Sequence, residues 1–134
     1  MSGGEEMQAL IRYRLDQADD ALRVGRLALD AGAPRDAANR AYYAMFYAVL
    51  ALLCLRGERP TRHTHAIGLF DLRFVKEHVF DKEFSAWLHE AFDLRQRADY
   101  REMVVIAPER AKEVLDMAAK FLDETRKYFQ DKLT

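Results

Sequence analysis

The pattern of hydrophobic and polar positions is dominated by one apolar run. From Ala41 to Leu55 every residue is apolar or aromatic, and the run contains no helix breaker. Its alanines, leucines and methionine favour a helix, and it is long for a buried strand. A membrane-spanning helix needs about 20 apolar residues, whereas this shorter run is flanked by Arg40 and Arg56. Because a helix that is apolar on all sides must be covered on all sides, we expect a central, protein-covered helix within Asp36–Arg56.

An amphipathic pattern precedes this run, from about Glu5 to Asp30. Its apolar residues are spaced as on one buried stripe of a helix, and they are Met7, Ile11, Leu15, Ala18, Leu22 and Leu29. Gly32 tolerates the left-handed conformation that ends a helix, and Pro34 suits the first turn of the next one. Since this connection is short, the first two helices should be antiparallel neighbours.

Two further helices are expected after the loop Gly57–Thr61. Thr64 is a candidate N-cap for the third helix, which should end near His78. Asp81 is a candidate N-cap for the fourth helix, which should end near Ala98. The residues expected to face inward are Ile67, Phe70, Phe74 and Val75 in the third helix, and Phe84, Trp87, Leu88, Ala91 and Leu94 in the fourth.

A short apolar stretch and a last helix complete the pattern. Residues 103–107 are apolar but too few to imply a sheet, so we expect a packed connector. Pro108 suits the first turn of a fifth helix, whose inward residues should be Ala111, Val114, Leu115, Ala118, Leu122, Thr125 and Phe129. A chain of 134 residues fits a single domain over residues 1–134. The pattern therefore predicts an all-α bundle of about five helices.

The composition narrows the choice of partners. A net charge of −1 argues against bulk electrostatic binding to nucleic acid or anionic lipid, although a local basic patch would still bind phosphate. The single cysteine, Cys54, lies inside the apolar run, where we expect a buried small hydrophobe rather than a reactive thiol. Residues 1–7 are polar and acidic and do not resemble a signal peptide, so we expect a cytoplasmic protein with no membrane partner.

Metal and cofactor motifs are absent from the sequence. Helical bundles that hold two metal ions use Glu-x-x-His on facing helices. The residues three positions before the four histidines are Pro60, Arg62, Val75 and Ala86. One cysteine in an apolar run and scattered histidines do not form a zinc ligand set, and no glycine-rich phosphate loop occurs. We therefore expect no metal and no cofactor.

Two polar clusters remain as candidates for chemistry. Asn39 and Arg40 lie at the start of the apolar run, and residues 95–100 (RQRADY) lie at the end of the fourth helix. Buried charges need partners, so one interpretation is a structural network in which Asp99 pairs with Arg40 or Arg95. The other interpretation is an anion-binding site, because arginines at a helix–loop junction suit phosphate.

The order of several motifs resembles one branch of the HEPN superfamily. The motifs are Asn-Arg-Ala-Tyr-Tyr-Ala-Met-Phe-Tyr-Ala at 39–48, Thr64-His65 followed by Ile67 and Phe70, Phe74-Val75, and Arg95-x-x-Ala-Asp-Tyr100. This branch consists of small prokaryotic proteins that are often encoded beside a minimal nucleotidyltransferase. The resemblance covers roughly residues 30–129 and implies a five-helix up-and-down bundle, commonly a homodimer. Many members of the superfamily are metal-independent ribonucleases, and several are toxins with the nucleotidyltransferase as antitoxin.

The resemblance also implies site residues. The nuclease motif of the superfamily is Arg, four to six residues, then His; Arg95 matches the arginine, but Tyr100 stands where histidine is expected. Histidine exchanges a proton near neutral pH, whereas tyrosine, with a pKa of about 10, is a poor base. We therefore expect little ribonuclease activity, with Arg95, Tyr100 and His65 as the candidate catalytic residues. The candidate RNA- or nucleotide-binding residues are Arg40, Arg97 and Asp99, and Arg40 should lie close to Asp99.

Three functions are compatible with the sequence. The first is a HEPN-domain protein of a toxin–antitoxin-like or defence module that acts with a nucleotidyltransferase and binds RNA or nucleotide at the Arg/Asp/Tyr cleft. The second is a metal-independent ribonuclease that uses Arg95 with His65 or Tyr100. The third is a non-catalytic helical scaffold. In each case we expect a homodimer, because large side chains surround the central helix and any exposed remainder would form an apolar patch. The candidate dimer contacts are Tyr43, Tyr47 and Leu50.

Overall fold

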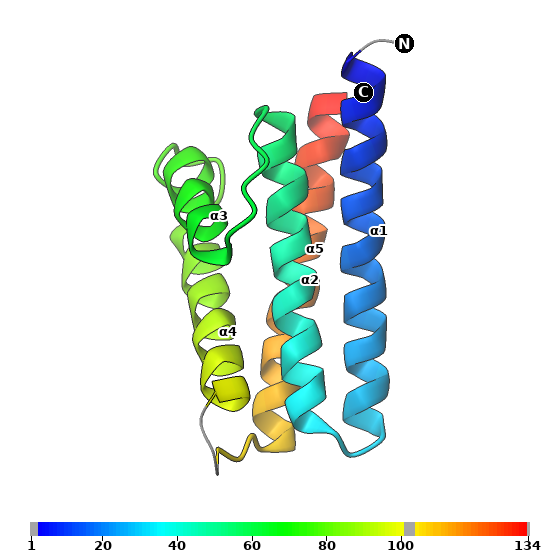
Figure 1. Ribbon diagram of the computed structural model, residues 1–134, viewed down its shortest axis with the longest axis vertical. Coiled ribbons are helices and arrows are strands. Elements are labelled where there is room, and N and C mark those ends of the chain that lie inside the picture. Colours follow the sequence, from blue (N-terminus) through cyan, green and yellow to red (C-terminus); the bar gives the residue numbers. More distant parts are fainter. Residues whose placement is uncertain (1–2, 101–103, 134) are drawn as a thin grey trace.

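Every regular element is helical in the part of the chain that the structure describes. The structure is a computed structural model that describes residues 3–100 and 104–133, with Tyr100 and Leu133 described by their backbone alone. The elements are α1 (Gly3–Asp30), α2 (Pro34–Leu55), α3 (His63–Phe70), the π-helix η1 (Asp71–Val75), α4 (Lys82–Tyr100) and α5 (Pro108–Leu133). The four long helices alternate in direction along the chain (Figure 1). The predicted all-α, five-helix up-and-down bundle is confirmed.

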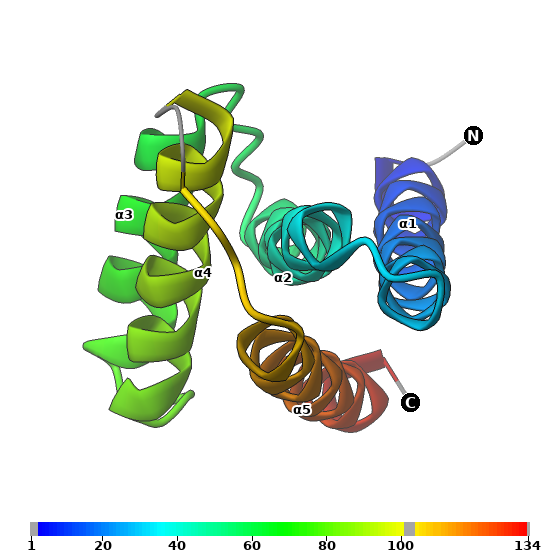
Figure 2. The ribbon, with the colours of Figure 1, turned by 90° about the horizontal axis from the view of Figure 1, so that it is seen from below.

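The apolar helix α2 lies at the centre of the bundle. Figure 2 shows α1 on one side of it, the pair α3 and α4 on the opposite side, and α5 below it, and it contacts each of these helices. By length and composition α2 could cross a membrane, a test that a buried core helix also passes, and 67% of its apolar window is buried inside the bundle. Between Ala41 and Cys54 the only residues that are not buried are Tyr43, Tyr47 and Leu50. Their spacing places them on one side of α2, which we call the open stripe.

A glycine lets α1 approach α2 closely. A Cβ atom added to Gly25 would lie 2.6 Å from Cδ2 of Leu115 on α5 and 3.1 Å from Cβ of Arg40 on α2. Ala18 and Ala21 are also buried on this side of α1. The inward stripe predicted for α1 did not include Gly25, because a glycine carries no hydrophobic signal. Its lack of a side chain fixes the distance between α1 and the segment of α2 that carries Arg40.

The predicted ends of α1 and α2 are confirmed. Gly32 and Gly57 both adopt positive φ, 78° and 77°, just after their helices end, as glycine does readily. Pro34 is the first residue of α2.

The prediction for the third helix is wrong in two respects. Arg62, not Thr64, occupies the N-cap position, and α3 begins at His63. The helix also does not continue regularly to His78, because α3 gives way after Phe70 to η1. A π-turn shifts the phase of the helix, and Phe70 at the end of α3 and Phe74 within η1 are both fully buried.

The last two helices follow the sequence pattern closely. α4 starts directly after Asp81, and the expected inward residues of α4 and α5 are buried except Trp87, which is half-buried. The connector before α5 is packed only in part, since Ile106 is buried whereas Val105 is 89% exposed. Met103, which was included in the predicted connector, lies outside the described residues.

Candidate functional site

Two arginines contact the ring of Tyr43 on the open stripe. The Cζ atom of Arg40 lies 4.8 Å from the ring centroid, and the Cζ atom of Arg95 lies 5.2 Å from it. Arg40 is one helical turn before Tyr43 on α2, whereas Arg95 reaches the ring from α4. A guanidinium is attracted to an aromatic face, but two guanidinium groups repel each other. This arginine cluster, defined as Arg40, Tyr43 and Arg95, therefore favours a negatively charged neighbour.

Arg95 is mostly buried and has one carboxylate partner. Its Nε atom lies 3.4 Å from Oδ2 of Asp99, one turn further along α4, and its side chain is only 14% exposed. This buried Nε makes no hydrogen bond with any residue that the structure describes. The pair is therefore held by charge attraction rather than by a hydrogen bond. Arg40 and Arg95 were the two predicted partners of Asp99, and the ion pair is formed with Arg95.

Arg40 has a neutral partner instead. Its Nε and Nη2 atoms both donate to Oδ1 of Asn39, at 3.1 and 2.9 Å. The structure pairs Arg40 with no carboxylate among the described residues, so the expected contact with Asp99 is not made. The physical reason is that Asp99 finds an arginine one turn away on its own helix, where no reach between helices is needed. The arginine cluster thus brings two positive charges together with one paired carboxylate.

A shallow hollow extends from the arginine cluster along α1. It has a volume of about 190 Å³ and is lined by Gln17, Asp20, Ala21, Val24, Arg40 and Tyr47. The carboxylate of Asp20 forms an exposed ion pair with Arg23 at 3.6 Å. The hollow therefore gives a ligand access to Arg40 from the open side of α2.

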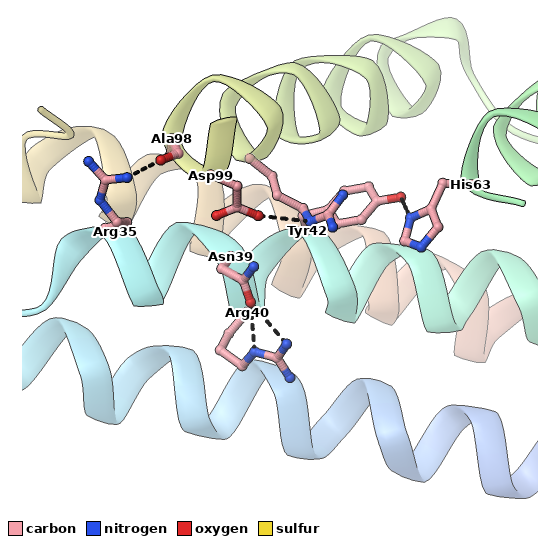
Figure 3. A network of polar contacts seen from close by, with 8 residues as sticks. Arg35, Asn39, Arg40, Tyr42, His63, Ala98 and Asp99 are labelled. Atoms are coloured by element: carbon pink, nitrogen blue, oxygen red, sulfur yellow. Dashed lines mark hydrogen bonds and ion pairs between the residues drawn. The ribbon is translucent and has the colours of Figure 1, made fainter. Parts of the chain in front are cut away.

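A histidine and a buried tyrosine lie next to the arginine cluster. The hydroxyl oxygen of Tyr42 lies 2.7 Å from Nδ1 of His63 (Figure 3). The imidazole of His63 stacks on the ring of Phe46, with centroids 4.2 Å apart and an interplanar angle of 3°. Arg95 also contacts Tyr42, with Cζ 5.4 Å from the ring centroid. One tyrosine ring thus connects His63 of α3 with Arg95 of α4.

The surroundings shift the protonation of both hydrogen-bonded groups. Burial raises the pKa of the Tyr42 hydroxyl far above its usual range, although Arg95 opposes the shift. Burial, with a smaller contribution from the charge of Arg95, lowers the pKa of His63 below its usual value of about 6.5. At neutral pH the pair is therefore an uncharged phenol beside an uncharged imidazole.

Three of the residues predicted for the site are not placed in this cluster. His65 is exposed. Its electrostatic neighbour is Glu58, whose pKa is lowered chiefly by a hydrogen bond from Arg73 and to a smaller extent by His65. Arg97 is paired with Asp93 at 3.0 Å. The side chain of Tyr100 lies outside the described residues.

His63, which was not a predicted site residue, lies next to the arginine cluster, whereas the predicted His65 does not. His65 follows His63 by two residues, and Arg97 follows Arg95 by two. Residues two apart on a helix point to different faces, so only the first of each pair reaches α2. Placing the start of α3 at His63, rather than after Thr64, would have identified His63, because in a helix with this start the side chain of His63 points towards Tyr42.

Arg35 holds the end of α4 near the start of α2. Its Nη1 donates to the main-chain oxygen of Ala98, and its Nη2 donates to that of Val104 in the connector. The last carbonyl groups of a helix have no partner within the helix, so this guanidinium acts as a cap for α4. Figure 3 shows Arg35 pointing to Ala98 beside Asp99. Arg35 was not a predicted site residue, yet it holds the turn that carries Asp99.

Other parts of the molecule offer less for ligand chemistry. Across residues 3–100 and 104–133, no three histidine, cysteine or acidic side chains gather as metal ligands. A larger hollow of about 510 Å³ is lined by Val75, His78, Phe80, Asp81, Lys82 and Glu83. It contains neither of the arginines that contact Tyr43, so the arginine cluster rather than this hollow defines the candidate site.

Comparison with known proteins identifies the family. The HEPN domain matches residues 11–128. A UPF0332 protein of Thermotoga maritima is 32% identical over 94% of this chain and 96% of its own length. Two proteins of Methanocaldococcus jannaschii named putative toxins are 31% identical over 95% of this chain and 91% of the relative, and 36% identical over 72% and 65%. The chain therefore belongs to the HEPN domain family.

Proposed function

We propose that this HEPN-domain protein is the toxin-like member of a toxin–antitoxin-like or defence module and binds RNA or nucleotide phosphate at the arginine cluster. The relatives named putative toxins support the toxin-like role. The observation that carries the binding proposal is the contact of Arg40 and Arg95 with one tyrosine ring, balanced by one carboxylate. Guanidinium groups bind phosphate oxygens through charge-assisted hydrogen bonds.

The aromatic ring fits the same class of ligand. Single-stranded nucleic acids bind proteins through basic grooves in which bases stack on aromatic side chains. Tyr43 and Tyr47 are partly exposed on the open stripe, next to a hollow that Arg40 and Tyr47 both line. Because the net charge of the whole chain is −1, attraction of RNA would come from this local surface. Each contacted phosphate of a single strand contributes about −0.7 to the dependence of log K on log salt concentration.

The same site supports binding better than cleavage. Metal-independent RNA cleavage needs a base that removes the proton of the 2′-hydroxyl. Tyr100 stands at the position of the expected histidine, and His65 lies near Glu58 rather than at the arginine cluster. The alternative function, a ribonuclease that uses Arg95 with His65 or Tyr100, is therefore the weaker proposal. Arg97, paired with Asp93 on α4, is not part of the proposed site.

Two partners belong to the proposal. A second copy of the chain would pack on the Leu50 end of the open stripe across a two-fold axis. Tyr43, Tyr47 and the arginine cluster would then lie at the edge of the interface, where RNA or nucleotide can reach them. A nucleotidyltransferase would act on Tyr100, whose hydroxyl would attack the α-phosphate of a nucleoside triphosphate and release pyrophosphate. Co-expression of this chain with a minimal nucleotidyltransferase from the same genome, followed by mass spectrometry of Tyr100, tests this part. An unmodified Tyr100 with an active nucleotidyltransferase would argue against it.

A binding assay tests the arginine cluster directly. Fluorescence anisotropy of a labelled ten-nucleotide single-stranded RNA, with AMP as competitor, distinguishes RNA from free nucleotide as ligand. Arg95→Ala should weaken binding about 10- to 100-fold, since a hydrogen bond to a charged group contributes about 1.5–3 kcal/mol. Arg97→Ala is the matched control, because it removes the same charge from another face of α4. Equal losses in both variants would show that binding depends on net charge and not on this cluster.

A further inference from the structure

His63 sits in a pocket made of aromatic rings. It stacks on Phe46 at 4.2 Å and approaches Tyr43 edge-on at 5.8 Å. Its Nδ1 atom lies 2.7 Å from the hydroxyl oxygen of Tyr42. These contacts fix both the plane of the imidazole and its rotation within that plane. The ring of His63 is therefore oriented as firmly as a ligand-binding group requires.

The buried hydroxyl of Tyr42 decides which nitrogen of His63 carries the proton. Tyr42 is fully buried, and its hydroxyl has no partner other than Nδ1 of His63 among the described residues. If the hydroxyl donates, Nδ1 accepts and the proton of the neutral ring must lie on Nε2. The opposite arrangement would leave a buried hydroxyl proton without an acceptor, which is unfavourable.

The positive charge of Arg95 also favours the neutral form of His63. Protonation of His63 would place a proton on Nδ1 as well, and Tyr42 would then lose its acceptor. It would also add a positive charge beside Arg95, which contacts the rings of both Tyr42 and Tyr43. The groups that face His63 are thus two tyrosines of α2 and one arginine of α4, with no carboxylate among the contacts that the structure gives it. The imidazole is kept neutral by its partner, by burial and by Arg95 together.

We propose that His63 is a phosphate-binding residue beside the arginine cluster. Its imidazole presents a fixed, uncharged Nε2–H donor to an oxygen of the bound nucleotide or RNA. This inference rests on the proposed function, because it adds a donor to the two arginines that bind the same ligand. Nε2 has no protein partner in the described part of the chain, and the His63 side chain is partly exposed. The guanidinium of Arg95 attracts the phosphate by its positive charge, and the Nε2–H group of His63 donates a directional hydrogen bond to one phosphate oxygen.

The proposal distinguishes His63 from a general base. A base must offer a lone pair to the substrate, but in this tautomer the lone pair lies on Nδ1 and is already occupied by Tyr42. His63 is therefore a binding residue, and its presence does not restore the function of the histidine that is missing at position 100. The hydrogen bond from Tyr42 occupies the lone pair of Nδ1, so His63 can donate a hydrogen bond from Nε2 but cannot accept a proton from the substrate.

The tautomer can be measured without any ligand. Nitrogen-15 labelling of the histidines and long-range proton–nitrogen correlation spectra report which ring nitrogen is protonated, and His63→Gln assigns the signal. We expect the Nε2–H tautomer at pH 7 and a ring that takes up its second proton at a lower pH than histidine in an unfolded peptide does. Tyr42→Phe, which removes the hydroxyl but keeps the ring, should release this preference. An Nδ1–H tautomer or a charged ring in the wild type would overturn the proposal.

Binding variants test the donor itself. In the RNA assay, His63→Asn keeps a polar atom near Nδ1 but has none at Nε2, and should weaken binding about 5- to 10-fold. His63→Gln places an amide donor near Nε2 and should recover most of the affinity. His65→Ala, two residues along α3, is the matched control and should bind as the wild type does. Thermal unfolding of each variant verifies that the fold is intact.

The outcomes separate this inference from the proposed function. If Arg95→Ala loses binding while His63→Asn keeps it, the arginine cluster binds phosphate and the role of His63 is wrong. If His63→Gln and His63→Asn lose binding equally, the donor at Nε2 is also wrong, because the conservative change should have rescued it. If the wild type binds neither RNA nor AMP, the proposed function and this inference fail together.

Discussion

Arg35, at the start of α2, donates a hydrogen bond to the main-chain oxygen of Ala98, near the end of α4. The same guanidinium also bonds to Val104 in the connector, so one side chain joins three segments. Asp99 and the backbone of Tyr100 follow directly after this contact. The position of the last turn of α4 is therefore set by a residue of α2.

Arg35→Ala should loosen this turn without unfolding the bundle. We expect a loss of about 1 kcal/mol of stability, because two charge-assisted hydrogen bonds to backbone oxygens disappear, one of them part-buried and the other exposed. Hydrogen exchange should become faster at residues 95–100 and remain unchanged in α1. Arg35→Lys is the control: it keeps the charge but not the forked geometry, so it should resemble the alanine variant. If the lysine variant behaves like the wild type, charge rather than shape makes this contact.

Gly25→Ala should destabilise the protein by about 1–3 kcal/mol, the usual range for an overpacked core. The added methyl group would lie 2.6 Å from Leu115 Cδ2, and α1 would have to move away from α2 and α5. Gly68→Ala is a matched control within α3, since a Cβ atom there meets nothing within 4 Å. In that helix alanine is favoured over glycine by up to about 1 kcal/mol. Urea unfolding of both variants measures the difference, and equal stabilities would contradict the close approach at Gly25.

The stability of the wild type should depend on pH partly through His63. Folding lowers the pKa of this residue, so below pH 6.5 the unfolded chain binds a proton that the folded chain does not. The contribution is fully present above the unfolded pKa and is lost as the pH falls below it. Between pH 7.5 and 5.5 the wild type should lose more stability than His63→Gln. Parallel curves for the two proteins would refute the assignment.

We expect a homodimer through the Leu50 end of the open stripe at micromolar concentration. Tyr43, Tyr47 and Leu50 are the partly exposed apolar residues in the middle of α2, and Leu50→Glu should give a monomer by sedimentation because it buries an unpaired charge in the interface. Val105→Glu changes an 89% exposed residue on the connector and should leave the dimer intact. A wild-type protein that sediments as a monomer would rule out this interface.

Purified protein should show little or no ribonuclease activity near neutral pH in EDTA. A positioned general base contributes about 10²–10⁴-fold to such reactions; Tyr100 replaces the expected histidine, and His63 has its Nδ1 lone pair engaged by Tyr42. Total RNA is incubated with the wild type beside Arg95→Ala. Strong cleavage that disappears in the variant would show that a base is present, and the nearby His63 would then replace His65 as its first candidate.

Much of the fold could be predicted because its signals are local. The apolar run from Ala41 to Leu55, the glycines at positions 32 and 57 and the prolines at positions 34 and 108 define α1, α2 and α5 almost to the residue. The π-helix could not be predicted in this way. Its phase shift accommodates the packing of Phe70 and Phe74 against Phe80, which depends on contacts between segments and not on spacing along the chain.

The candidate site was predictable by composition but not by geometry. Arg40, Arg95 and Asp99 were identified from charge in an apolar context, and the structure places the two arginines on Tyr43. The pairing of Asp99 with Arg95 and the choice of His63 over His65 depend on helix phase. If the start of α3 is shifted by two residues, His65 instead of His63 is expected to face Tyr42. Sequence patterns rarely locate the end of a helix more closely than this.

The burial of α2 has a consequence for synthesis of the protein. α5, which covers one side of α2, is formed from residues 108–133, so it leaves the ribosome only after the entire apolar helix has emerged. Until then the nascent chain exposes a hydrophobic segment that by composition alone could enter a lipid bilayer. Partly synthesised chains with exposed apolar surface aggregate or recruit chaperones. Premature stops before residue 108 should therefore yield insoluble products rather than a smaller folded bundle.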